Sequence, residues 1–175
     1  MQKIVFITLL LALGTGLAVF YLKGGYPGFA AQTFTIALKA PKHQWIEDAG
    51  VRLSSTKLLG QTEFTVAHTP VDIGKKRSIS KVVGIHPEFD DQLDAEMVFV
   101  YEDADLDGHY ENDLILYSSA DAGKTWDPHP NSVVDPERNT ITLDGIAHFS
   151  LWTAAPPPPA PGGVAASLQL WLKAN

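Results

Sequence analysis

A chain of 175 residues, 45% hydrophobic and 10% aromatic, has the size and composition of one globular domain with extensions. Its net charge of −7 is unevenly spread, because residues 82–123 hold twelve acidic side chains and neither Lys nor Arg, a field that repels nucleic acid. The absence of cysteine excludes disulfides, thiolate metal sites and a cysteine nucleophile.

The first thirty residues have the pattern of an export segment. Lys3 precedes an uncharged apolar run from Ile4 to Leu22, which predicts a hydrophobic helix. Residues 1–30 are therefore either a signal peptide, with Gly28 and Ala30 placed for cleavage after Ala30, or an uncleaved membrane anchor. In both cases the remainder is expected outside the cytoplasm, in the extracellular space or on a bacterial cell surface. Membrane contact is expected only through residues 4–22, if they are not cleaved.

Short strands are predicted along the rest of the chain. Apolar and polar residues alternate with a period of two in 93–101, where Met97 and Phe99 share one face with Tyr101. Similar runs are bounded by Pro, Gly or Asp turns, and no amphipathic helix of normal length is evident. The predicted strands are 33–38, one around Val51, 62–66, 78–85, 93–101, 114–117, 132–134, 140–143 and 147–153, with Asp144-Gly145 as a turn. This spacing predicts an all-β antiparallel sandwich over residues 31–154.

A proline-rich segment follows the predicted sandwich. Four consecutive prolines cannot enter a sheet ladder and favour an extended spacer, so residues 155–163 are predicted to be a linker. Only twelve residues come after it, which is too few for a domain. Residues 164–175 are therefore interpreted as the truncated start of a following domain, and the chain as a fragment of a longer protein.

An acidic loop separates two of the predicted strands. Its oxygen donors are spaced like those of a calcium loop, with Gly108 at the turn. The predicted ligands are Asp103, Asp105, Asp107, His109 through its carbonyl, Glu111 and Asp113. The last position of such a loop is Leu114 here, and Glu102 is a substitute ligand. Two interpretations stay open. The loop either binds calcium, which is the one possible cofactor, or is a solvated loop whose Asp residues form tight turns.

A second motif follows the acidic loop directly. Ser119, Asp121, Gly123, Thr125 and Trp126 spell Ser-x-Asp-x-Gly-x-Thr-Trp, which resembles the Asp-box of sialidases and related β-proteins. The resemblance implies a structural hairpin whose Ser and Asp tie the turn, whose Gly takes a positive φ, and whose Trp packs into the core. A propeller would need several copies of the motif, and the sequence has one.

The region 93–153 as a whole resembles the Ig-like β-sandwich modules of large secreted bacterial surface proteins. The resemblance rests on matching motifs at Tyr101 and Asp103, Asp107-Gly108, Glu111 to Leu114, Leu116-Tyr117, Gly123 to Trp126, Gly145-Ile146, Phe149-Ser150 and Trp152-Thr153. Separately, residues 161–175 resemble the opening of a concanavalin-like or laminin-G-like domain. Together they imply a module, a linker, and then a sandwich that binds carbohydrate or protein.

Catalysis finds little support in the sequence. The six histidines form no HExxH or His-x-His pattern, and His148 and Ser150 lack a Gly-x-Ser-x-Gly elbow. We therefore expect a non-catalytic exported surface module that spaces or presents an adjacent binding domain of the same chain, with an extracellular glycan or protein as a further partner. The alternative is a calcium-assisted carbohydrate-binding domain. A third interpretation is a membrane-anchored hydrolase that uses surface carboxylates.

Overall fold

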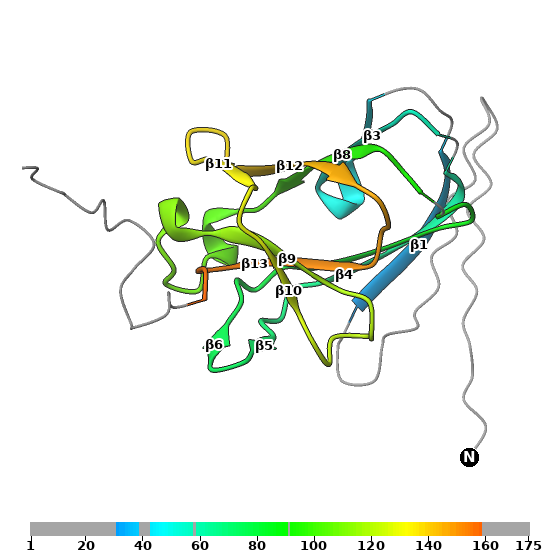
Figure 1. Cartoon of the computed structure of the whole chain (residues 1–175). Helices are drawn as coiled ribbons and strands as arrows, with labels where there is room; N and C mark the ends of the chain where they lie inside the picture. Colours follow the sequence, from blue (N-terminus) through cyan, green and yellow to red (C-terminus); the bar gives the residue numbers. More distant parts are fainter. Residues whose placement is uncertain (1–30, 39–42, 58, 91, 159–175) are drawn as a thin grey trace, which may run out of the picture.

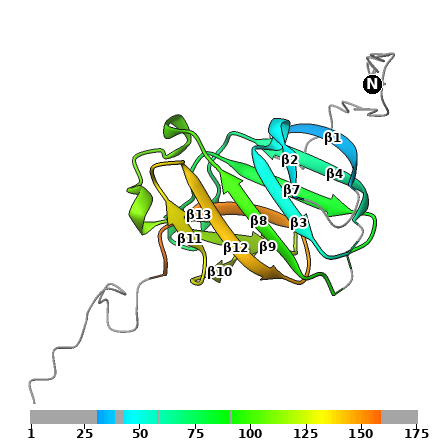
Figure 2. The same cartoon turned by 90° about the horizontal axis from the view of Figure 1, so that it is seen from above.

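Two antiparallel sheets face each other across one hydrophobic core (Figure 1; Figure 2). The computed structural model describes residues 31–38, 43–57, 59–90 and 92–158. The prediction of an all-β antiparallel sandwich is confirmed. The predicted N-terminal hydrophobic helix, most of the linker and the start of the following domain lie outside the described residues. None of the helices in the described part has the length and hydrophobicity of a membrane span.

The sheets draw on strands from the whole of the described chain. Sheet A has the order β1 (Ala31–Leu38), β4 (Gly60–Ala67), β7 (Val82–Pro87), β13 (Leu151–Ala155), β9 (Ile115–Ser119), β10 (Asp127–His129). Sheet B has the order β11 (Val133–Asp135), β12 (Thr140–Ile146), β8 (Ala95–Val100), β3 (Val51–Ser55), β2 (Gln44–Ile46). A small hairpin pairs β5 (Asp72–Ile73) with β6 (Lys76–Arg77), and short 3₁₀ turns form η1 (Glu47–Ala49), η2 (Asp103–Asp105) and η3 (Glu111–Asp113).

The core lies between the two sheets, and the period-two pattern of the strands creates it. Met97 and Phe99 of β8 point inward and are fully buried, as predicted. From sheet A, Phe34 and Phe64 stack with their ring centroids 5.4 Å apart, and Trp152 is 2% exposed. Interlocked aromatic and branched side chains of this kind supply most of the free energy that holds a sandwich together.

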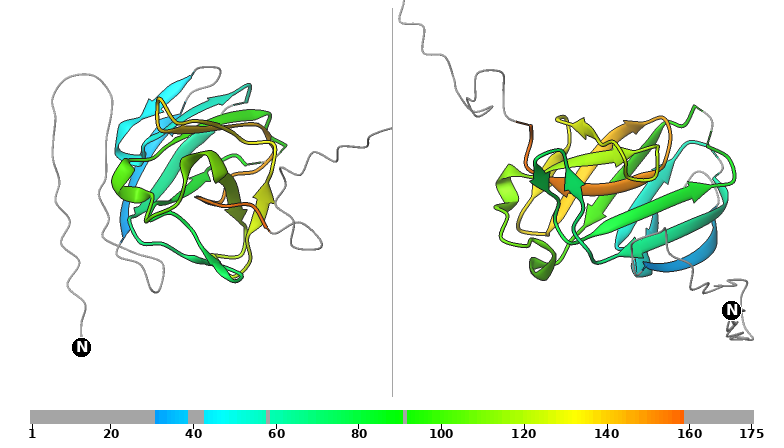
Figure 3. Two further views of the ribbon diagram at one scale, coloured as in Figure 1. Left: turned by 90° about the vertical axis from the view of Figure 1, so that its left-hand side faces the viewer. Right: turned by 90° about the horizontal axis from the view of Figure 1, so that it is seen from below.

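A second, smaller apolar cluster lies on the outer face of sheet A. Ala67 and Val82 of the sheet contact Val71, which precedes the β5–β6 hairpin, and Trp126, which follows the β9 turn. Figure 3 (right) looks onto this face, with the β5–β6 hairpin in front of the sheet. The outer face of sheet A is thus covered over part of its area by segments that fold back onto it.

Several boundaries differ from the sequence prediction; the predicted strand 78–85, for example, is β7 and begins only at Val82. The predicted turn at Asp144-Gly145 is a bulge inside β12, which continues to Ile146 with a register shift after Leu143. The positive φ of Gly145, 72°, allows this extra residue without breaking the strand. As a result the predicted strand 147–153 begins later, at Leu151.

The chain enters and leaves the sandwich at the same end of sheet A. Ala31 pairs with Ala67, Ala67 with Val82, and Val82 with Thr153, so the start of β1 is level with Thr153, the middle residue of β13, which runs on to Ala155. Three strand spacings separate them, or roughly 14 Å. The chain therefore enters at the β1 edge of sheet A and leaves from β13, three strands further in, and Figure 2 shows these two points well apart.

Candidate functional site

The acidic loop joins β8 to β9 and folds as η2, a tight turn and η3. The turn uses two left-handed residues, Asp107 with φ 50° and Gly108 with φ 83°. Asp tolerates this conformation better than most residues because its short polar side chain can bond locally, and glycine has no Cβ to clash. These two residues thus close the turn between η2 and η3.

Two of the six predicted calcium ligands are engaged by the protein itself. Asp105 is 5% exposed; its Oδ1 lies 3.1 Å from His68 Nδ1, and its Oδ2 accepts a hydrogen bond from the Glu102 backbone N–H at 3.0 Å. Asp103 Oδ1 accepts a hydrogen bond from Asn139 Nδ2 at 2.7 Å. Both carboxylates therefore fasten the loop to neighbouring segments.

The other four predicted ligands do not gather around a common centre with these two. Asp107 and Asp113 are exposed, while His109 and Glu111 are half-buried. Over residues 31–38, 43–57, 59–90 and 92–158, no three His, Asp or Glu side chains are grouped in a way that could hold a metal ion. Calcium binding at this loop, and the calcium-assisted carbohydrate-binding function that depends on it, stay predictions from the sequence.

The Asp-box residues form one closed network after β9. Ser119 Oγ donates to Asp121 Oδ1 at 2.9 Å and accepts from the Gly123 N–H at 2.8 Å. Asp121 Oδ1 also accepts from the N–H groups of Lys124 and Thr125, at 3.0 and 2.9 Å, and its Oδ2 accepts from Thr125 Oγ1 at 2.8 Å. Four donors thus converge on one carboxylate, and they close the turn.

This network changes the acidity of Asp121. Its hydrogen bonds, above all those from the backbone and side chain of Thr125, lower the pKa of the carboxyl from 3.8 to about 2. Donors that point at a carboxylate favour its charged form. The hairpin is therefore held by an ionised Asp121 at any ordinary pH.

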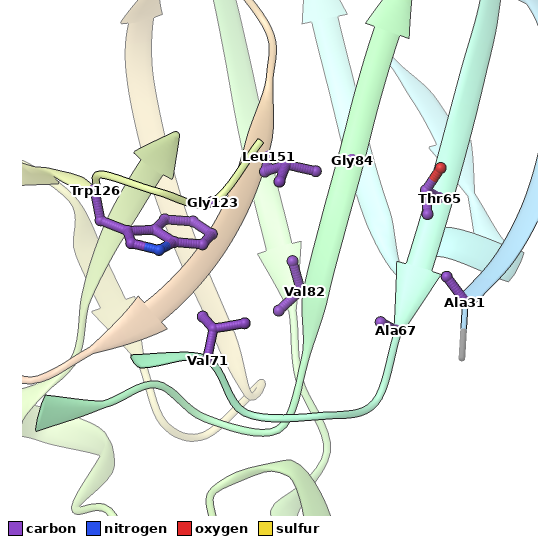
Figure 4. Close-up of a pocket in the computed structure, with 9 residues that line it drawn as sticks. All are labelled: Ala31, Thr65, Ala67, Val71, Val82, Gly84, Gly123, Trp126 and Leu151. Carbon is purple, nitrogen blue, oxygen red and sulfur yellow. The ribbon is translucent and has the colours of Figure 1, made fainter. Parts of the chain in front are cut away.

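Trp126 packs beneath this hairpin on the outer face of sheet A, and so it lies outside the main core in which the sequence motif had placed it. Figure 4 shows its indole ring beside Gly123, with Val71, Val82 and Leu151 around it. The hollow among these side chains is apolar and has a cavity volume of only about 20 Å³. That is room for about one water molecule, so the hollow is a packing feature and not a ligand pocket.

Lys81, which the sequence analysis did not single out, is a buried cation between the sheets. It is 6% exposed; its Nζ donates to the carbonyls of Val100 at 2.5 Å and Gly50 at 3.4 Å, and lies 5.2 Å from the Phe99 ring centroid. Burial lowers its pKa from 10.5 to about 8, against the opposing effect of Asp105 and Glu102. A lysine just before an apolar strand, such as Lys81 before β7, gives no sequence signal that would distinguish burial from exposure.

The histidine and serine pairs serve as structural ties. His148 lies in the loop before β13, where its Nδ1 is 2.8 Å from the Asp90 carbonyl, and Ser150 Oγ donates to the Leu151 carbonyl at 3.4 Å. Across the β9–β10 pair, Ser118 Oγ lies 2.8 Å from His129 Nε2. The ring centroids of His129 and Trp152 are 5.1 Å apart. Burial lowers the pKa of His129, which favours its neutral form.

Comparisons with known proteins do not assign this chain to a family. No family model, curated protein or solved structure matches it. What is shown is the architecture, an antiparallel sandwich of two sheets.

Proposed function

We propose that the chain is a non-catalytic, exported β-sandwich module that presents an adjacent binding domain of the same longer protein. The observation that carries this proposal is that the sandwich fixes the start of the linker in place. β13 is buried at all five positions between β7 and β9, and the linker begins directly behind it. A fixed exit suits a presenting module, because a flexible exit would let the orientation of the neighbour average out.

Two side chains continue this hold beyond the strand. Tyr117 of β9 donates its hydroxyl to the Pro156 carbonyl at 2.9 Å, and Lys76 of β6 donates its ammonium to the Pro157 carbonyl. Burial raises the pKa of Tyr117, so that its hydroxyl keeps its proton and remains a donor. The prolines themselves favour an extended, semi-rigid backbone. The buried strand β13, the two side-chain hydrogen bonds and the prolines together support a linker that leaves the sandwich in a fixed direction.

The shared end of sheet A supports presentation more than lengthwise spacing. Ala31 and Thr153 are level with each other, three strands apart. A spacer that adds length to a chain gains most when its two ends lie at opposite poles. Here β1 begins and β13 ends toward the same end of the strands, so the module adds little length along the strand direction.

The proposal also includes the kind of module and the domain that follows it. The motif resemblance supports an Ig-like module of a bacterial surface protein, followed by a concanavalin-like or laminin-G-like domain, with residues 1–30 as the export segment. The contacts of the candidate side chains support a non-catalytic role. Asp105, Asp121 and His148 each form hydrogen bonds that fasten loops.

The linker hold can be tested by site-directed spin labelling, since the chain has no other cysteine. A nitroxide on Pro158→Cys is expected to be strongly immobilised in the full chain. Combining Lys76→Ala with Tyr117→Phe is expected to release it, while Lys75→Ala, on the neighbouring exposed Lys, is the matched control and should change nothing. A label that is equally mobile with and without the two ties would contradict a fixed exit.

Presentation itself can be measured on cells. A sugar-binding test domain of known ligand is fused after Asn175, and the fusion is displayed on a bacterial surface. Deleting residues 31–154, with the leader and linker retained and display levels matched by antibody, is expected to lower the capture of ligand-coated beads. Equal capture with and without the module would refute the presenting role.

A further inference from the structure

The outer face of sheet B carries a row of side chains that crosses all five strands. Trp45 pairs with Arg52, Arg52 with Val98, Val98 with Thr142, and Thr142 with Val133. In an antiparallel sheet, directly paired residues lie on the same face. The row therefore spans four strand spacings, or roughly 19 Å. Figure 2 looks down on this face, where β11, β12, β8, β3 and β2 lie side by side.

A groove runs along this row. Its volume is about 490 Å³, which falls within the range of small-ligand sites. Trp45, 52% exposed, stands at the β2 edge, and Val133, 66% exposed, stands at the β11 edge. Between them the groove is lined by Arg52, Val98, Val100, Thr140 and Thr142, and beside Val133 by Asp135 and Arg138.

The charges in the groove differ from those of the rest of the molecule. Asp135 and Arg138 pair with each other at 2.5 Å, which leaves Arg52 as the net charge of the groove. Within the described part of the chain, Arg52 makes no salt bridge. An uncompensated guanidinium on the exposed face of a chain of net charge −7 is suited to a ligand carboxylate, which it can bind with two parallel hydrogen bonds.

The lining also indicates the kind of molecule that would carry the carboxylate. The groove has a single aromatic ring, two threonine hydroxyls and an Asp–Arg pair, whereas the centre of a protein interface is depleted in charge and rich in aromatic residues. An aromatic face next to several hydroxyl, carboxylate and guanidinium groups matches a sugar ring, whose C–H face is apolar and whose rim is made of hydroxyls. The acidic side chains Glu102, Asp103 and Glu137 line the adjoining hollow, so a ligand that is acidic at every sugar would be repelled there.

We propose that this groove binds a short glycan segment that carries a carboxylate on one sugar and has neutral sugars beside it. Trp45 stacks on a sugar ring, Arg52 pairs with the carboxylate, and Thr140, Thr142 and the Asp135–Arg138 pair bond the hydroxyls. The site lies on the opposite sheet from the linker exit, and it uses no residue of the acidic loop.

Calorimetry on the full chain tests the proposal with three hexasaccharide probes. Hyaluronan oligosaccharide alternates an acidic and a neutral sugar, chitin oligosaccharide is neutral throughout, and oligogalacturonate is acidic throughout. Hyaluronan oligosaccharide is expected to bind best, more weakly as salt is raised, and with unchanged affinity in the presence of a chelator. Equal binding of the chitin probe, stronger binding of oligogalacturonate, loss of binding with the chelator, or no binding of any probe would each overturn the proposal.

Two matched pairs of variants locate the site. Trp45→Ala is compared with Phe89→Ala, because Phe89 has almost the same exposure, 49%, outside the groove. Arg52→Gln is compared with Arg77→Gln on the β5–β6 hairpin. Each groove variant is expected to weaken binding by about tenfold, the usual effect of removing a charge-assisted bond or an aromatic contact, and each control to leave it unchanged. Unaltered affinity in both groove variants, with melting temperatures matching the wild type, would refute the site.

Discussion

The outer face of sheet A is partly covered by other segments of the chain, whereas the outer face of sheet B is open. On sheet A, segments that carry Val71 and Trp126 fold back over the strands, and β13 is buried at every position. On sheet B, the strands alternate between a buried inner residue and an outer one, such as Val51 and Arg52, and the outer face is left as a groove. The loops decide this difference, since both sheets are built from similar short strands. A covered face adds stability, whereas an open face is available for contact.

A pair of tryptophan substitutions tests this contrast most strongly. Trp126→Ala removes the side chain that closes the covered face and is expected to lower the free energy of unfolding by about 2–3 kcal/mol. Trp45→Ala, on the open face, is expected to lower it by less than about 0.5 kcal/mol. Urea denaturation of the two variants measures both effects. Similar losses would show that the two outer faces do not differ in their contribution to stability.

The next effect concerns Lys81, which joins the two sheets. The Lys81 pKa is about 8 in the folded protein, whereas a solvated lysine in the unfolded chain has the ordinary value of 10.5, so the unfolded chain binds more protons between these values. Stability is therefore expected to rise with pH, by on the order of 2 kcal/mol between pH 8 and 10. Above pH 10 the raised pKa values of Tyr101 and Tyr117 reverse the trend, because the unfolded chain then loses protons first.

The control for that rise is Lys81→Met, which keeps the length of the side chain and removes the titrating group. Its stability should not show the increase between pH 8 and 10, as measured by chemical denaturation at fixed salt. Parallel curves for the variant and the wild type would mean that another group is responsible.

Asp121 should produce a smaller effect at the acid end. Because its pKa is lowered to about 2, its contribution to stability is fully present above the unfolded value of 3.8 and is lost as the pH falls through 2. The melting temperature of the wild type should therefore fall more steeply from pH 4 to 2 than that of Asp121→Asn. An identical acid dependence in the two proteins would argue against the hydrogen-bonded carboxylate as the fastener of the hairpin.

The smallest effect is expected from Arg138→Gln on the open face. Arg138 and Asp135 form an exposed salt bridge, and such pairs contribute little because water and salt screen them. A loss below about 0.5 kcal/mol in urea denaturation is expected. A loss of more than about 1 kcal/mol in the free energy of unfolding would show that the groove rim stabilises the fold. The two outer faces would then differ less in their contribution to stability.

Much of the fold could be read from the sequence because alternation is a local property. The run 93–101 indicated that Met97 and Phe99 share a buried face, and both are fully buried in β8. The region around Val51 was less legible, because β2 has only three residues and η1 interrupts the pattern before Gly50, with φ 56°, redirects the chain into β3.

The candidate sites were harder to predict, for a physical reason. Alternation shows which residues share a face, but not whether a distant segment covers that face, and so Trp126 was expected in the main core. The groove depends on the register of five strands from three separate parts of the chain, which brings Trp45 level with Val133. The buried position of Lys81 likewise depends on carbonyls contributed by residues 50 and 100.

The entry and exit of the chain at one end of sheet A have a mechanical consequence. Tension that pulls Ala31 and Thr153 apart acts across the strands, along the hydrogen bonds of the β1–β4, β4–β7 and β7–β13 pairs. The bonds are then loaded one after another from that end, as in the opening of a zipper, instead of all together in shear. A pulled molecule would therefore release β1 first and lengthen gradually, which makes the sandwich an extensible element between whatever its two ends are attached to.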